Sequence, residues 1–179
     1  MGRADRVSAN PTFGGVNLIG RRTGGCLACR IMMAKELDQD SAGWLRGLLD
    51  DFGCTTGTLH RSTDGEWLDL VVAVGVPDHL MPVISRIPFG KGIAGAAAAT
   101  REPVELCNLQ QDLGGVAKEG ARDTKVAGSL AVPVFAPGEG TVMGTLGIGM
   151  ATPHDFTGDE KARLAAVAEE VARVWQQDH

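Results

Sequence analysis

Two runs of alternating apolar residues in the last third of the chain restrict the fold more than any other feature of the sequence. Leu130, Val132 and Val134 alternate with other residues in the first run, and the second run alternates over 142–150. A period of two places alternate side chains on one face of a β-strand. The turn-forming sequence Pro-Gly-Glu-Gly at 137–140 joins the two runs, so they predict a central hairpin.

Helical patterns lie before and after this hairpin. Apolar residues recur at helical spacing over 37–52, and Gly53 supplies a left-handed terminator. Near the other end, Thr157 and Glu160 fit a capping box, and an apolar stripe follows as far as Trp175. We therefore predict an α+β fold in which two terminal helices pack together on one face of an antiparallel sheet. The other face is left for connections and a pocket.

Shorter elements fill the chain between the terminal helices. The elements expected, in order, are a hairpin over 54–60 and 67–74, one or two helical turns at 78–85, an alanine-rich helix ending at Thr100 and a short strand at 104–107. Residues 108–125 are polar and contain glycines, and long connections of this kind often cover a site.

Composition excludes two classes of partner. The chain of 179 residues is 44% hydrophobic and 22% charged, which suits one globular domain. Its 17 basic and 22 acidic residues give a formal net charge of −5, and only 4% of residues are aromatic. Such a chain offers neither a basic face nor rings for stacking on bases, so we predict no nucleic-acid binding. No apolar run approaches the ~18 residues of a membrane span, so we predict no membrane partner.

The N-terminal 33 residues differ from the rest of the chain. They contain five arginines against the single acid Asp5, a net charge of +4, which leaves −9 for residues 34–179. They are rich in glycine and lack the continuous apolar core of a secretion signal. A disordered basic tail, a transit-like segment and an extension ahead of a start at Met32 or Met33 remain open. We expect a single domain over 34–179.

The four cysteines predict neither a disulfide scaffold nor a metal site. Without a signal peptide, a reducing cytoplasm is the expected location. Cys26 and Cys29 form one C-x-x-C pair, with no second pair or matching histidines to complete a zinc site. Cys54 and Cys107 each border an apolar stretch, which favours a buried, inert thiol. We predict no metal and no cofactor.

Four motifs together resemble the GAF domain family. In the order that this family uses, they are Ile-Pro-Phe-Gly-Lys-Gly-Ile-Ala-Gly at 87–95, Arg-Glu-Pro-Val at 101–104, Gly-Thr-Leu-Gly-Ile at 144–148 and Phe-Thr-Gly-Asp-Glu at 156–160. The resemblance covers about residues 37–175. It implies a six-stranded antiparallel sheet flanked by helices, with a small-molecule pocket on the face opposite the terminal helices. Family members sense many different ligands, so the resemblance leaves the ligand open.

The one enzymatic branch of this family, the free methionine-(R)-sulfoxide reductases, depends on cysteines at three places. This sequence has Ile84, Ala94 and the cysteine-free stretch 126–128 at those places. Sulfoxide reduction needs a thiolate nucleophile and a resolving thiol. We therefore predict no enzymatic activity and keep a thiol-dependent reductase as the alternative. The Asn-Lys pair typical of the cyclic-nucleotide branch is also absent.

The glycine-rich turn before the alanine-rich helix is the candidate ligand site. Glycines there let backbone N–H groups and the positive helix end face an anion. The residues concerned are Gly92, Ile93, Ala94 and Gly95. A tight strand-to-helix turn with no ligand role explains the same glycines equally well.

Similarity to small stand-alone bacterial GAF proteins, which include nitrate sensors, adds two residues to this site. In those sensors the anion rests on backbone amides at this turn, beside a Trp from the second strand, a place that Trp67 matches here. The same similarity places Ser129 among the ligand-binding candidates, and plain sheet packing remains an alternative for Trp67. We expect the loop 109–125 to act as a lid, and Lys91 and Arg122 could add a positive charge.

These observations predict a cytoplasmic bacterial sensor. It would bind a small anion, such as nitrate, or a metabolite and signal to a partner such as a histidine kinase. A domain that only dimerises, without a ligand, is a further alternative. We also predict a homodimer through helices 37–52 and 159–176, because Val171, Val174 and Trp175 exceed what one short helix must bury.

Overall fold

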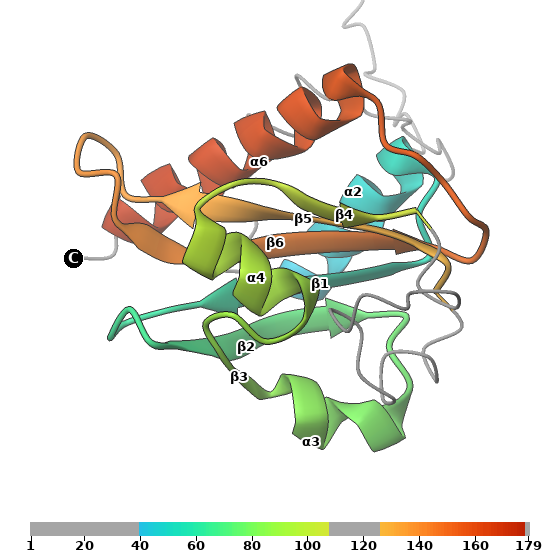
Figure 1. Ribbon diagram of the computed structural model, residues 1–179, viewed down its shortest axis with the longest axis horizontal. Helices are drawn as coiled ribbons and strands as arrows, with labels where there is room; N and C mark the ends of the chain where they lie inside the picture. Colours follow the sequence, from blue (N-terminus) through green and yellow to red (C-terminus); the bar gives the residue numbers. More distant parts are fainter. Residues whose placement is uncertain (1–39, 108–125, 178–179) are drawn as a thin grey trace, which may run out of the picture.

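The computed structural model describes residues 40–107 and 126–177 (Figure 1). Several expectations fall outside these residues. They concern the N-terminal 33 residues with Cys26 and Cys29, the first turn of the helix expected from Leu37, and the loop 109–125 with Arg122. In the described part of the chain, no helix combines the length and hydropathy needed to cross a bilayer.

A six-stranded antiparallel sheet forms the centre of the molecule, as predicted (Figure 1). Its strands are, in spatial order, β3 (Arg86–Pro88), β2 (Trp67–Val74), β1 (Thr56–Arg61), β6 (Val142–Met150), β5 (Gly128–Phe135) and β4 (Val104–Leu106). Both predicted hairpins, β1–β2 and β5–β6, are present with antiparallel register. The sequence patterns did not predict β3, a three-residue edge strand that pairs with the start of β2.

The two terminal helices, α2 (Ser41–Phe52) and α6 (Gly158–Gln177), lie on the same face of the sheet (Figure 1). Asp40 caps α2 by accepting a hydrogen bond from the Gly43 N–H at 2.8 Å, and Gly53 ends it at a φ of 64°. The predicted capping box starts α6. Its Glu160 N–H donates to Thr157 Oγ1 at 3.2 Å, and the Thr157 N–H donates to a Glu160 carboxylate oxygen at 2.8 Å.

The main hydrophobic core lies between these helices and the sheet. Leu45 and Leu48 of α2 and Leu164 and Val171 of α6 pack against apolar residues of the four central strands. Trp175, which is 3% exposed, belongs to the same core. The stripe on α6 is therefore not surplus apolar surface, and the reason given for a homodimer is wrong. The stripe is buried within one protomer because the sheet beneath it is long enough to cover its last turns.

The opposite face of the sheet carries the short helices. These are the 3₁₀ turn η2 (Asp78–Leu80), α3 (Met81–Ile84) and α4 (Gly92–Thr100), with α4 running across the front of the sheet in Figure 1. A second, smaller core joins Leu68 of β2, Ala98 of α4 and Val142 of β6. The fold thus has two differently covered faces, and the pocket belongs to the second.

A bulge in β2 changes which of its residues meet each face. Leu59 of β1 pairs with Val72, but the next residue, His60, pairs with Leu70, so Val71 is an extra residue. Val72 consequently packs toward the terminal helices, whereas Leu68 packs toward α4. Because of this single extra residue, side chains of even-numbered residues face α4 at the start of β2 and face the terminal helices at its end.

Candidate functional site

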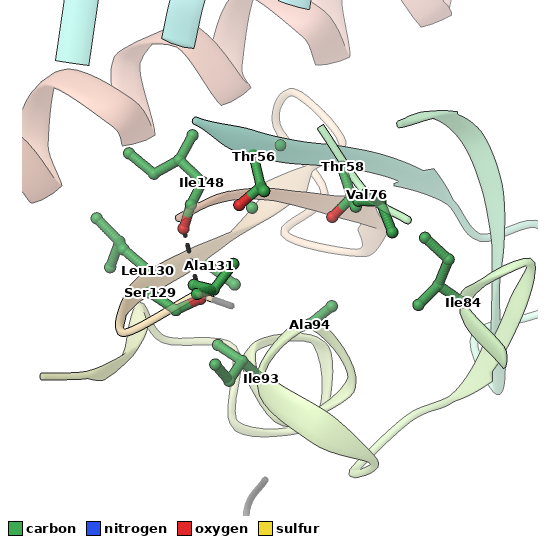
Figure 2. A pocket seen from close by; sticks show the side chains of 13 residues that line it. Thr56, Thr58, Val76, Ile84, Ile93, Ala94, Ser129, Leu130, Ala131 and Ile148 are labelled. Atoms are coloured by element: carbon green, nitrogen blue, oxygen red, sulfur yellow. Dashed lines mark hydrogen bonds between the residues drawn. The ribbon is translucent and has the colours of Figure 1, made fainter. Parts of the chain in front are cut away.

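A cavity of about 140 Å³ lies between the sheet and the short helices. Strands β1, β6 and β5 form its floor, and α3 and α4 form its walls. Figure 2 shows Ile93 and Ala94 of α4 facing the strands that carry Thr56, Thr58 and Ser129. This is the sheet face opposite the terminal helices, where the sequence predicts a pocket.

The floor owes its hydroxyl groups to residues two apart on β1. Thr56 pairs with Gly149 and Thr58 with Gly147, so both side chains project from the same face. Thr56 Oγ1 donates to the Gly149 carbonyl at 3.3 Å. A Cβ at Gly149 would lie 2.6 Å from Thr56 Oγ1, so only glycine leaves room for the hydroxyl there. The alternation of threonine and glycine in neighbouring strands thus opens the cavity above the sheet.

Ser129 supplies the hydroxyl on the β5 side of the floor. Its Oγ donates to the Ile148 carbonyl at 3.4 Å, drawn as the dashed line in Figure 2. Ser129, Ile93 and Ala94 all line the cavity, and their role in ligand binding stays a prediction. Among the residues that the structure describes, none that lines the cavity is ionisable. The cavity is therefore mainly apolar, with a few hydroxyl groups, as small-molecule sites usually are.

The first turn of α4 forms part of the cavity wall. The first N–H groups of a helix have no partner within it, and Ile93 and Ala94 belong to this first turn. Lys91 occupies the N-cap position, is exposed, and is not among the residues that line the cavity. Of the two cations expected near this turn, the described one, Lys91, thus does not reach the cavity, and Arg122 lies outside the described residues.

The two glycines of the predicted site serve the backbone. Neither Gly92 nor Gly95 lines the cavity. Gly92 adopts a φ of 65°, which side-chain-bearing residues rarely adopt. A Cβ at Gly95 would lie 2.5 Å from the Pro88 carbonyl oxygen, so helix α4 packs there against the preceding turn. Replacement of Gly95 by Val would therefore disturb the packing of α4 and could not serve as a clean test of ligand binding.

Trp67 lies away from the cavity, contrary to expectation. Its neighbour Leu68 is packed against α4, so alternation along β2 turns Trp67 to the other face. Trp67 is 37% exposed, and the Arg86 guanidinium lies 5.1 Å from its ring centroid. Arg86 also pairs with Asp69 at 3.6 Å. Trp67 is thus part of a surface cluster on the β2–β3 edge.

Two buried polar side chains lie next to the cavity and were missed by sequence reasoning. His60 is 1% exposed and Thr145 is fully buried. They are opposite each other on β1 and β6, two pairs further along than Thr58 and Gly147 and therefore on the same face. Within the described residues, His60 Nδ1 and Thr145 Oγ1 have no hydrogen-bond partner. A two-residue spacing of Thr56, Thr58 and His60 in the sequence was the signal that could have identified this polar row.

The two thiols within the described residues, Cys54 and Cys107, show none of the features of a reactive site. Burial raises the pKa of Cys54 to about 12, with the Glu160 carboxylate adding to the effect. Cys107 is exposed, and a hydrogen bond with Asp155 raises its pKa. Neither lines the cavity. Among residues 40–107 and 126–177, His, Cys, Asp and Glu nowhere gather in threes that could hold a metal ion.

Comparison with known proteins assigns the fold to a family. A family model described as the GAF domain matches residues 42–176. The chain belongs to the GAF domain family. No curated protein sequence matches this GAF domain significantly.

Solved structures with the same fold come from proteins with different activities. The GAF domain of an Acinetobacter phosphoenolpyruvate-protein phosphotransferase is 16% identical, with a TM-score of 0.68 over 86% of this chain and 92% of that one. The free methionine-R-sulfoxide reductase of Neisseria meningitidis, solved with its substrate, is 18% identical, with a TM-score of 0.66 over 84% and 86%. A domain from Sinorhizobium meliloti, of a protein assigned as a two-component sensor histidine kinase, is 15% identical, with a TM-score of 0.62 over 79% and 91%. At these identities the likeness concerns the fold alone.

Proposed function

We propose that this GAF domain is a sensor that binds a small molecule in the cavity between the sheet and α4. The observation that carries the proposal is the cavity itself. It is about 140 Å³ in volume, mainly apolar, and has hydroxyl groups from Thr56, Thr58 and Ser129 on its floor. A concave apolar site with a few converging polar groups is the usual form of a small-molecule site. GAF domains are in general sensory and signalling modules.

The ligand is a small anion or a metabolite. The first-turn N–H groups of α4 support this choice, because a helix start favours an acceptor or a negative charge. The cavity is comparable in size to one that accepts a benzene ring, which favours a ligand on the order of six to ten non-hydrogen atoms. Cyclic nucleotides exceed that size.

Occupancy is passed on to a signalling partner, such as a histidine kinase, in the bacterial cytoplasm. A second copy of the chain is the other candidate partner. A homodimer would have to use the outer, polar sides of α2 and α6, because their apolar stripes are buried in the core. Light scattering at about 100 μM tests for the homodimer, since a standard-sized interface stays associated at that concentration. A monomer would leave a different protein as the partner.

No enzymatic activity is proposed. A sulfoxide reductase needs a thiolate near its substrate, and neither Cys54 nor Cys107 lines the cavity. The raised pKa of both thiols supports the same conclusion, because it lowers the thiolate fraction at neutral pH.

A thermal-shift screen tests the sensor proposal. The panel contains nitrate, nitrite, 2-oxoacids, cyclic nucleotides, methionine sulfoxide and small neutral alcohols and amides. A ligand at a hundred times its Kd should add about 2.7 kcal/mol to the free energy of unfolding.

A pair of substitutions on α4 locates the binding site. Ala94→Leu fills the cavity and should abolish the shift, whereas Ala99→Leu on the exposed side of the same helix should preserve it. Equal shifts in both variants would place the ligand elsewhere. A panel without any shift would favour a domain that only dimerises.

A further inference from the structure

The chemistry of the cavity floor depends on where its hydroxyl protons point. Thr56 Oγ1 donates to the Gly149 carbonyl and Ser129 Oγ donates to the Ile148 carbonyl. A hydroxyl group has one proton, so both oxygens offer lone pairs on their remaining sides. While these two bonds are made, both groups present acceptor lone pairs toward the cavity.

His60 extends the same chemistry beyond the floor. Its Nε2 lies 3.0 Å from the Ile84 carbonyl oxygen, which can only accept, so the ring proton is on Nε2. The other nitrogen, Nδ1, then carries a lone pair and has no partner among the described residues. Burial lowers the pKa of His60 and keeps the ring neutral. Nδ1 is therefore a buried acceptor.

Thr145 places a second unpartnered atom beside this ring. It is opposite His60 in the β1–β6 register, and side chains so placed lie about 5 Å apart at Cβ. Its Oγ1 is fully buried and has no partner in the described part of the chain. A buried polar atom without a partner costs about 1–3 kcal/mol. Two such atoms side by side, next to a cavity, point to a molecule that supplies the missing hydrogen bonds.

The cavity and this polar pair share a wall. Ile84 lines the cavity with its side chain (Figure 2), and its backbone carbonyl oxygen lies 3.0 Å from His60 Nε2. Thr58 and Gly147, the neighbouring pair in the same register, also line the cavity. His60 and Thr145 do not themselves line the cavity, so a ligand would reach them through a modest displacement of α3, the four-residue helix that carries Ile84.

We infer that the cavity selects a compact uncharged molecule that donates hydrogen bonds, such as an alcohol or a primary amide, with His60 Nδ1 and Thr145 Oγ1 as the innermost polar contacts. This inference rests on the proposed sensor function and narrows its ligand class. A bare inorganic anion only accepts hydrogen bonds, so it has nothing to donate to His60 Nδ1. The Thr56 and Ser129 hydroxyls could donate to an anion only by giving up their bonds to the Gly149 and Ile148 carbonyls. The donor group of the ligand faces the sheet, and its apolar part lies against Ile93 and Ala94.

Three probes with one carbon skeleton test the inference by calorimetry on the full chain. Benzyl alcohol is neutral and donates a hydrogen bond, toluene has no polar group, and benzoate is an anion. Sodium nitrate serves as an inorganic anion. We expect benzyl alcohol to bind at least ten-fold more tightly than benzoate or nitrate. Tighter binding of either anion would overturn the inference.

A near-isosteric substitution tests the polar pair itself. Thr145→Val removes the hydroxyl and should lower the affinity for benzyl alcohol about five- to ten-fold, while the affinity for toluene stays the same. Thr100→Val, on the exposed end of α4, removes a hydroxyl bonded to the Ala96 carbonyl and should change neither. An unchanged ratio of alcohol to toluene affinity in Thr145→Val would also overturn the inference. Nitrogen NMR of the His60 ring provides a second readout, because a new hydrogen bond at Nδ1 should shift its resonance.

The outcomes separate this inference from the proposed function. Anion binding that Ala94→Leu abolishes would preserve the sensor proposal and reject the neutral donor. Absence of binding by every probe and every compound of the screen would reject both. If a bound water alone satisfies His60 Nδ1 and Thr145 Oγ1, benzyl alcohol binds no better than toluene, and the inference is wrong.

Discussion

At the scale of single residues, the polar groups of this protein divide into those that the fold satisfies and those that it does not. Asp40, Thr157 and Glu160 complete helix caps. His60 and Thr145 are buried with unpartnered atoms beside the cavity. Protein interiors rarely retain such atoms without a reason, which makes these two residues the most informative in the molecule.

Thiol chemistry gives the first prediction at this scale. Cys54 is buried with a pKa raised to about 12, so Ellman's reagent should leave it unmodified in the native protein and modify it on unfolding. Reduction of free methionine-(R)-sulfoxide with dithiothreitol should show no turnover. A rate that disappears in Cys107→Ser would contradict this and would identify an active thiol.

The second prediction concerns the dependence of stability on pH. Burial holds the folded-state pKa of His60 below its unfolded value of 6.5, although the backbone bond to Ile84 and the Asp69 carboxylate act in the opposite direction. As pH falls through 6.5, the unfolded state binds a proton first. The contribution of His60 to stability is therefore complete above pH 6.5 and decreases below it.

Urea denaturation at pH 7.5 and pH 5.5 measures this effect. The midpoint of the wild type should decrease more between the two pH values than that of His60→Gln. The matched control is His79→Gln, because His79 is exposed on η2, and it should behave as the wild type does. An equal decrease in wild type and His60→Gln would contradict the prediction.

At the scale of elements, the sequence predicts most of the fold because the residues that start and end its helices and strands are strong local signals. The strand β2 begins at Trp67 and ends at Val74, as the apolar run predicts. Asp40, Gly53 and Thr157 occupy the caps that their residue types favour. Signals of this kind act over a few residues, so they can be recognised in the sequence without the tertiary structure.

The features that sequence reasoning missed depend on contacts between distant segments. The edge strand β3 exists because Arg86–Pro88 finds the start of β2, and its sequence has no strand pattern of its own. The bulge at Val71 decides that Trp67 faces away from the cavity, and no local signal marks it. Three of the predicted candidates, Ile93, Ala94 and Ser129, line the cavity. Thr56 and Ile84 line it too, but the sequence did not predict them as candidates.

The capping box of α6 gives a prediction at this scale. Thr157→Ala removes the acceptor of the Glu160 N–H bond and should lower the free energy of unfolding by roughly 0.5–2 kcal/mol. The backbone N–H of Thr157 and, to a smaller extent, its hydroxyl hold the pKa of Glu160 below its usual value of 4.5. Thr157→Ala removes only the hydroxyl's bond to the carboxylate, so the loss should be smaller well below pH 4.5, where Glu160 is protonated. Thr63→Ala, in an exposed turn, is the control and should change little. A loss of equal size in both variants would contradict a specific capping role.

At the scale of the whole molecule, one sheet separates the cavity from the terminal helices. Adjacent residues of β1 face opposite sides, because Leu59 packs in the core under α2 and α6 while Thr58 lines the cavity. Leu146 of β6 belongs to the same core, one residue from Thr145 on the other face. A ligand that orders the floor of the cavity therefore acts on the same strands that hold the terminal helices.

The last prediction follows from this arrangement and is measured by hydrogen–deuterium exchange. With the compound of the screen that raises the melting temperature most, amides of β1, β6 and α6 should exchange more slowly than in the free protein, because local opening of these packed elements becomes rarer. The Ala94→Leu variant should show no such change. Protection confined to α3 and α4 would contradict transmission through the sheet and would place the response on the cavity side. That result would also remove the reason for placing the binding surface of a signalling partner on the outer side of α2 and α6.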